Sequence, residues 1–217
     1  MWKPNAEGVF ESELLAQFPW VWHGFGSRTS GDWPGDYTQL KQIHSSIVHV
    51  ADASGCLGEG DALVTSTPGL RVGVRTADCA PLLMVDSGNR AVAAVHAGWR
   101  GTVTRVAQRT VQQMTSTFGT DSARLHVAIG PCIAECCFEV GPEVAAEFVE
   151  WFPDATKRTH LDLVTVNVAQ LVQSGVPREQ IDVAGLCTVC NDAQFHSFRR
   201  DKEKSGRMVA AIGIHST

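Results

Sequence analysis

The chain has 217 residues, of which 44% are hydrophobic and 19% charged, and its formal net charge is −5. This length suits one domain that buries its core without disulfides, and the composition excludes an intrinsically disordered chain. The negative charge disfavours nucleic acid as a partner, because phosphate-backbone binding needs a basic surface and the Lys and Arg residues are dispersed.

No stretch approaches the ~20 apolar residues of a membrane span. The first residues also have no apolar run long enough for a signal peptide. We therefore expect a cytoplasmic protein that does not bind membranes.

The first half of the chain predicts a succession of strands with no helix between them. Short β-rich runs are separated by Gly, Asp, Ser and Pro residues, which are typical of turns. The predicted strands cover residues 47–50, 62–65, 70–76, 82–86 and 91–96.

From Thr102 the spacing of apolar residues changes to that of a helix with Thr102 as its N-cap, running through Met114. Further helices are predicted at 142–152 and 162–174, and further strands at 125–129, 181–185 and 208–214. The pattern predicts the α/β class and one domain over residues 1–217. Because the first five strands lack intervening helices, mixed or layered sheets fit better than a doubly wound parallel sheet.

The seven cysteines are an odd number, and without a secretion signal they are better interpreted as thiols than as disulfides. Three of them, Cys132, Cys136 and Cys137, lie close together in the chain. The motif from Cys187 to Cys190 is Cys-x-x-Cys and could be a zinc half-site, a redox pair or a structural turn. Since no second Cys-x-x-Cys and no thioredoxin-like pattern accompany it, we interpret it as a turn.

Three residues form a candidate metal site: His44, Cys79 and His96. Each alone could be a buried structural residue. Together they are a nitrogen and sulfur set that suits zinc, and three protein ligands leave the open position of a catalytic site. Their spacings of 35 and 17 residues do not by themselves show that they meet in space.

Two basic segments are candidates for binding an anion. The first runs from Gly98 through Arg100 and Gly101 to Thr102, and is either a seat for phosphate at a helix start or a tight turn. The second, residues 195–201, contains Arg199 and Arg200 beside aromatic residues, and is either a site for an anion and a planar base or a polar loop. Neither nucleotide phosphate-loop signature is present.

Several motifs together resemble the YfiH family, whose members have been labelled laccase-domain or polyphenol oxidase proteins. The resemblance extends over nearly the whole chain and rests on these strings: Gln42-Ile43-His44, Asp61-Ala62-Leu63-Val64-Thr65, Thr76-Ala77-Asp78-Cys79-Ala80-Pro81, His96-Ala97-Gly98-Trp99-Arg100-Gly101-Thr102, Ala128-Ile129-Gly130-Pro131-Cys132-Ile133, Cys137-Phe138-Glu139-Val140-Gly141 and Phe198-Arg199-Arg200-Asp201. It implies a single layered αββα domain with mixed sheets. It also implies a Zn²⁺ ion held by His44, Cys79 and His96.

The resemblance implies a purine nucleoside phosphorylase, acting on adenosine, inosine, guanosine and methylthioadenosine with inorganic phosphate, and an additional adenosine deaminase activity. Asp78 and Glu139 are then candidates to move protons, and Arg100 to orient the phosphate, with Gly98, Gly101, Arg199 and Arg200 as further substrate-binding candidates. The chain would act as a monomer or homodimer.

Two other functions stay open. Some relatives are linked to amidases that edit peptidoglycan precursors of the UDP-MurNAc-L-Ser type, where Cys79 would be a nucleophile activated by His44 or His96. A binding module without catalysis is the other. The laccase label is disfavoured, because multicopper oxidases use paired His-x-His motifs and none occurs among the eight histidines.

Overall fold

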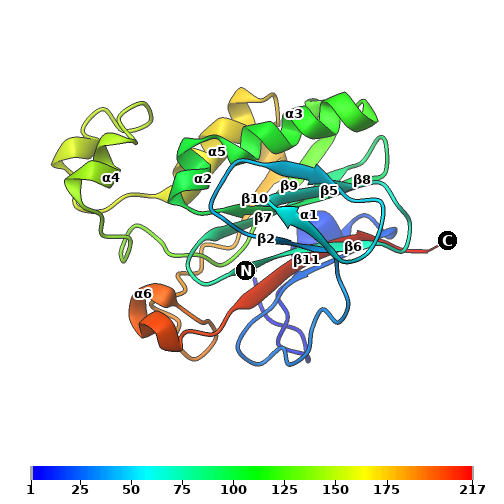
Figure 1. The fold of residues 1–217 in the computed structure, drawn as a ribbon, viewed down its shortest axis with the longest axis horizontal. Helices are drawn as coiled ribbons and strands as arrows, with labels where there is room; N and C mark the ends of the chain where they lie inside the picture. The colour runs from blue at the N-terminus through cyan, green and yellow to red at the C-terminus, as the bar shows by residue number, and fades with distance from the viewer. Residues whose placement is uncertain (1, 217) are drawn as a thin grey trace.

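Two β-sheets packed face to face form the centre of the molecule, and helices cover one side of them (Figure 1). The structure is a computed structural model that describes residues 2–216. The predicted α/β class with layered, mixed sheets is confirmed.

The larger sheet has six strands and mixes parallel with antiparallel pairs. Its two outer pairs are parallel and its inner pairs antiparallel. In spatial order the strands are β10 (Ile181–Val183), β9 (Leu125–Ile129), β7 (Ala80–Asp86), β8 (Ala91–Ala97), β5 (Ala62–Thr65) and β3 (Val48–Val50). Every residue of β5, β7 and β8 is buried, which explains their continuous apolar sequences.

The smaller sheet has three antiparallel strands, in the order β1 (Val21–Phe25), β11 (Met208–Ile214) and β6 (Arg71–Thr76). It packs on one face of the larger sheet through a shared apolar core that includes Leu83 and Val92 from one sheet and Val74 and Ile212 from the other. A separate parallel pair joins β2 (Gln39–Lys41) to β4 (Cys56–Glu59).

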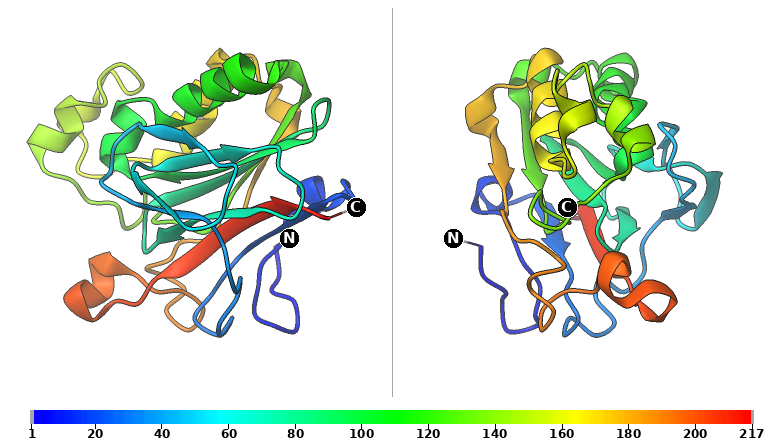
Figure 2. Two further views of the ribbon diagram at one scale, coloured as in Figure 1. Left: turned by 45° about the vertical axis from the view of Figure 1, so that its right-hand side comes forward. Right: turned by 90° about the vertical axis from the view of Figure 1, so that its left-hand side faces the viewer.

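Helices α3 (Val106–Phe118) and α5 (Leu163–Gln173) lie side by side on the other face of the larger sheet (Figure 2). The remaining helices are short: α1 (Glu13–Ala16), α2 (Trp99–Val103), α4 (Pro142–Ala146) and α6 (Phe198–Asp201). Short 3₁₀ helices cover Ser122–Arg124, Ala155–Lys157, Arg178–Gln180 and Lys202–Lys204. Among the residues described, none of the helices combines the length and the apolar character that a membrane span requires.

The predicted helix start at Thr102 is wrong. Helix α2 begins at Trp99 after Gly98, and the chain then breaks before α3, because Arg105 adopts a left-handed conformation with φ 65°. The hydroxyl of Thr104 donates to the carbonyl of Arg100, so a side chain competes for the backbone at the break.

Other predicted elements differ at their ends. Helix α4 stops at Ala146 instead of residue 152, and β10 stops at Val183. Strands β1, β2 and β4 were not predicted, and residues 195–201, for which an anion site and a polar loop both stayed open, contain α6. The strands at 62–65, 125–129 and 208–214 have the predicted limits.

Candidate metal centre

The register of the larger sheet brings the three predicted ligands together at one end of its central strands. Strands β7 and β8 are antiparallel with Pro81 opposite His96, so Cys79, just before β7, lies beside the end of β8. The ligand atoms of His44, Cys79 and His96 all lie within 4.8 Å of one another. The rings of the two histidines are 4.9 Å apart between centroids.

Asp61, a buried residue next to the cluster, positions two of its members through hydrogen bonds. It is fully buried at the start of β5, beside His96, whose backbone N–H donates to the Asp61 carbonyl at 2.7 Å. The Asp61 carboxylate accepts hydrogen bonds from the backbone N–H groups of Ile43, His44 and Ser45, at 2.6 to 3.3 Å. The loop that carries His44 is therefore tied to the sheet by one side chain.

The same carboxylate sets the orientation of the His96 ring. Nδ1 of His96 donates to Oδ1 of Asp61 at 2.8 Å, because an ionised carboxylate can only accept. This leaves Nε2 free to bind a metal. A ligand histidine whose second nitrogen donates to a carboxylate is the usual arrangement at zinc sites, so the donor set fits this ion.

The charges of the cluster reinforce one another. Burial alone would raise the pKa of Cys79, but the charge of His96 and hydrogen bonds from His44 and His96 outweigh it and lower the pKa to about 6. Burial alone would lower the pKa of His96, whereas the Cys79 thiolate and the Asp61 carboxylate raise it to about 9. Hydrogen bonds from His96 and Ser45 overcome the effect of burial on Asp61 and lower its pKa to about 2. A thiolate, the form that binds metal, is thus favoured at neutral pH.

Gly98 allows the backbone to pass closely behind the ligands. A Cβ atom at this position would lie 2.9 Å from Sγ of Cys79 and 3.0 Å from Cδ2 of His44. At Gly101 a Cβ atom would lie 3.0 Å from the carbonyl oxygen of Ser45. Both predicted glycines therefore act by close packing behind the ligands, and neither lines the cavity in front of them.

The three ligands open into a cavity of about 870 Å³. Aromatic side chains of Trp99, Phe138 and Phe198 form part of its lining. Its basic lining residues are Lys41, Arg75, Arg100, Arg199, Lys202 and Arg207. Within residues 2–216 one acidic side chain lines it, that of Asp78. The cavity therefore suits an anionic or partly aromatic ligand.

Of the predicted proton carriers, Asp78 lies in the cavity and Glu139 does not. Oδ1 of Asp78 accepts from the hydroxyl of Thr188 and Oδ2 from the backbone N–H of Arg199, both at 2.6 Å. The side chain of Glu139 is exposed, outside the cavity lining.

The predicted arginines have different positions. Arg100 lines the cavity with its guanidinium 4.3 Å from the centre of the Trp99 ring. Arg199 also lines it, but donates to the carbonyls of Cys137 and Glu139. Arg200 lies outside the lining, where it donates to the carbonyls of Thr188, Val189 and Phe195 and so holds the chain before β11 in place.

The family profile described as "Multi-copper polyphenol oxidoreductase laccase" matches residues 29–215. A solved structure of the hypothetical protein YfiH from Bacillus licheniformis superimposes with a TM-score of 0.87, covering 98% of each chain at 26% identity. The chain belongs to the YfiH family. The resemblance inferred from the motifs is thereby confirmed.

Two YfiH-family relatives carry names that describe enzymes. A Deinococcus radiodurans protein named "Purine nucleoside phosphorylase" is 45% identical over 184 residues, covering 82% of this chain and 70% of that one. A protein from an unknown prokaryotic organism named "Adenosine deaminase RL5" is 38% identical over 196 residues, covering 82% of this chain and 74% of that one.

Sequence reasoning missed the central role of Asp61 and the contributions of Arg75 and Phe138 to the cavity. Asp61 follows Gly60 and precedes a strand that is buried throughout. A carboxylate at the start of such a strand is costly unless it is paired, and this was the signal that could have identified it.

Proposed function

We propose that this YfiH-family chain is a zinc-dependent purine nucleoside phosphorylase with adenosine deaminase as a side activity. The observation that carries the proposal is the cluster of His44, Cys79 and His96 at the wall of a basic, partly aromatic cavity. The names of the Deinococcus radiodurans and RL5 relatives support the same two reactions.

Zinc bound by these three residues would supply a Lewis acid with one open position facing the cavity. The chain's own residues have separate tasks. Arg75 and Arg100 would neutralise and orient inorganic phosphate, which must approach C1′ of the ribose as the bond to the purine breaks. The rings of Phe138 and Phe198 offer flat surfaces on which the purine can stack.

Proton transfer falls to Asp78 in this proposal, because its carboxylate lies in the cavity. In deamination a carboxylate must carry protons between water and the purine. Glu139, the other candidate from the sequence, would need its segment to move before it could reach the substrate.

Incubation of the purified protein with adenosine and phosphate, followed by separation of adenine, inosine and ribose 1-phosphate, tests the proposal. We expect adenine, a smaller amount of inosine with the hypoxanthine released from it, ribose 1-phosphate equal to the two bases together, and loss of all these products on chelation. Omission of phosphate should abolish ribose 1-phosphate and leave inosine. Intact adenosine under all conditions would contradict the proposed reactions.

One arrangement favours a second candidate, a Cys/His amidase that edits peptidoglycan precursors. Cys79, His96 and Asp61 form a chain in which His96 bonds to the carboxylate on one side and faces the thiol on the other. Cysteine hydrolases use this order of nucleophile, base and orienting group. The lowered pKa of Cys79, about 6, suits a nucleophile as well as a ligand.

Chelation and alkylation distinguish the two candidates. A chelator should silence the zinc enzyme and leave a thiol amidase active. Iodoacetamide in metal-free buffer should inactivate the amidase on a UDP-MurNAc-L-Ser substrate. Release of serine that survives chelation would replace the phosphorylase proposal with the amidase.

A further inference from the structure

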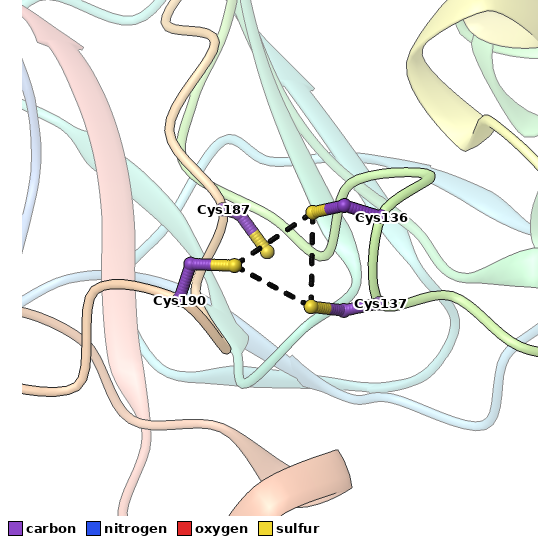
Figure 3. A group of neighbouring side chains, drawn as sticks. All are labelled: Cys136, Cys137, Cys187 and Cys190. Atoms are coloured by element: carbon purple, nitrogen blue, oxygen red, sulfur yellow. Dashed lines mark hydrogen bonds between the residues drawn. The ribbon is translucent and has the colours of Figure 1, made fainter.

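A second group of sulfur atoms lies outside the candidate metal centre, at the junction of two loops (Figure 3). Cys136 and Cys137 follow strand β9, and Cys187 and Cys190 follow strand β10. The parallel pairing of these strands brings the two loops side by side. All four sulfur atoms lie within 4.8 Å of one another and point toward a common centre.

Three of the sulfurs are spaced much as in a tetrahedron around one ion, and the fourth, that of Cys187, lies within 4.8 Å of them. Sγ of Cys136 lies 3.7 Å from those of Cys137 and Cys190, and Sγ of Cys137 lies 3.4 Å from that of Cys190. With Zn–S bonds of about 2.3 Å, the sulfurs of a tetrahedral site are about 3.8 Å apart. A disulfide requires a separation of about 2.05 Å, well below the observed values.

The turn that carries Cys187 and Cys190 also suits a thiolate. Backbone N–H groups of Ala134, Val189 and Cys190 donate hydrogen bonds to the sulfur of Cys187. Four thiolates at this distance repel one another strongly, and a divalent cation at their centre removes that repulsion.

We propose that Cys136, Cys137, Cys187 and Cys190 bind a structural zinc ion in a closed, four-sulfur site. Four protein ligands leave no open position, so this ion would take no part in catalysis. The Cys-x-x-Cys turn is then one half of the site, and the adjacent pair of cysteines is the other half.

The contacts around the site indicate what the ion would stabilise. Arg199, in the cavity lining, donates to the carbonyl of Cys137, and Thr188, inside the Cys-x-x-Cys turn, donates to Asp78 in the cavity. Phe138, which also lines the cavity, follows Cys137 directly. An ion at the four sulfurs would therefore hold one wall of the cavity in place.

Zinc content of purified variants tests this site independently of any activity. We expect two zinc ions per chain in the unmodified protein, and one in the Cys136→Ser/Cys190→Ser double variant. Cys79→Ala should also lose one, and the three substitutions combined should lose both. Cys56→Ser is the matched control, because Cys56 is exposed, lies outside both clusters and should leave the zinc content unchanged. Full zinc content in the double variant would overturn the proposal.

The unmodified protein provides a second measurement if the double variant does not fold. Cys56, Cys136 and Cys190 are all exposed, so a free thiol at any of them should react quickly with a colorimetric thiol reagent. We expect Cys56 to react at once and the other two to react only as zinc is released to a metal-sensitive dye. Reaction of Cys136 and Cys190 as fast as Cys56 without zinc release, or a disulfide between them, would overturn the proposal.

Discussion

The two metal-competent clusters of this molecule are built in different ways. His44, Cys79 and His96 lie at one end of the central strands of a buried sheet. Strand register and the carboxylate of Asp61 position them there. The four cysteines lie on two loops, and three of them are at least partly exposed. One cluster is positioned by a buried sheet and a buried carboxylate, whereas the other lies between two loops that backbone hydrogen bonds of Cys132 to Leu186 and Thr188 also join.

Because the two clusters are built differently, a metal ion would have a catalytic role at the first and a structural role at the second. A rigid three-ligand site leaves a position for a substrate, and the protein keeps its shape when the ion leaves. A four-ligand site between loops contributes its binding free energy to folding. We therefore expect metal loss to lower stability at both clusters and to abolish activity only at the first.

Cys79→Ala should have the largest effect on activity. It removes the sulfur ligand, so we expect phosphorolysis to fall to the detection limit and one zinc ion to be lost. The lost ion also binds only the folded state, so the thermal midpoint should fall as well. Measured turnover, zinc content and thermal unfolding together check this, and a variant with full turnover would refute the assignment of Cys79.

Cys136→Ser/Cys190→Ser should lower stability without removing a ligand of the first cluster. Loss of an ion that binds only the folded state removes about 3 kcal/mol at zinc concentrations 100-fold or more above the dissociation constant, which lowers the midpoint by about 5–10 °C. Thermal unfolding with and without added zinc measures this shift. A midpoint equal to that of Cys56→Ser would contradict the comparison.

Asp61→Asn should weaken the first cluster without removing a ligand. The amide cannot accept all the hydrogen bonds from the 43–45 loop and His96, so zinc affinity should fall about 10–100-fold. Competition with a chelating dye measures the affinity. Asp86→Asn is the matched control, because Asp86 is equally buried but bonds to a turn far from the ligands. Equal zinc affinity in both variants would show that Asp61 does not position the site.

Gly98→Ala should have the smallest effect. Its methyl group would press on Cys79 and His44 and shift the ligands by a few tenths of an ångström. This overpacking should cost the zinc-bound form about 1–2 kcal/mol, which lowers the zinc affinity about tenfold. The same dye competition checks this, and an affinity unchanged from the unmodified protein would mean that the ligands adjust without cost.

The sequence predicts the buried strands better than the exposed ones. The strands at 62–65 and 125–129 have the predicted limits, because their largely apolar runs are bounded by polar residues or, after Ile129, by Gly130 and Pro131. The short strands β2 and β4 escaped prediction, since they are largely exposed and lack a strong apolar pattern. The helix break at Arg105 escaped it too, because the apolar spacing continues through the break.

The three candidate ligands of the first cluster could be predicted from residue types and family motifs. The hydrogen bonds by which Asp61 positions them could not. Asp61 contacts a loop about 16 residues before it and a strand end 35 residues after it. The local sequence indicates only that a carboxylate before a buried strand needs partners, and not which residues those partners are. The pairing of Cys136 and Cys137 with the Cys-x-x-Cys motif was hidden for the same reason, because the two halves lie more than 50 residues apart.

Local pattern and composition thus determined the class of fold, the buried strands and the identity of the soft ligands, since these depend on the chemistry and spacing of neighbouring residues. Only the tertiary structure decided which candidate ligands meet, which carboxylate orients them and that four of the other six cysteines form a second group. These depend on strand register and loop placement, which come from contacts between distant parts of the chain.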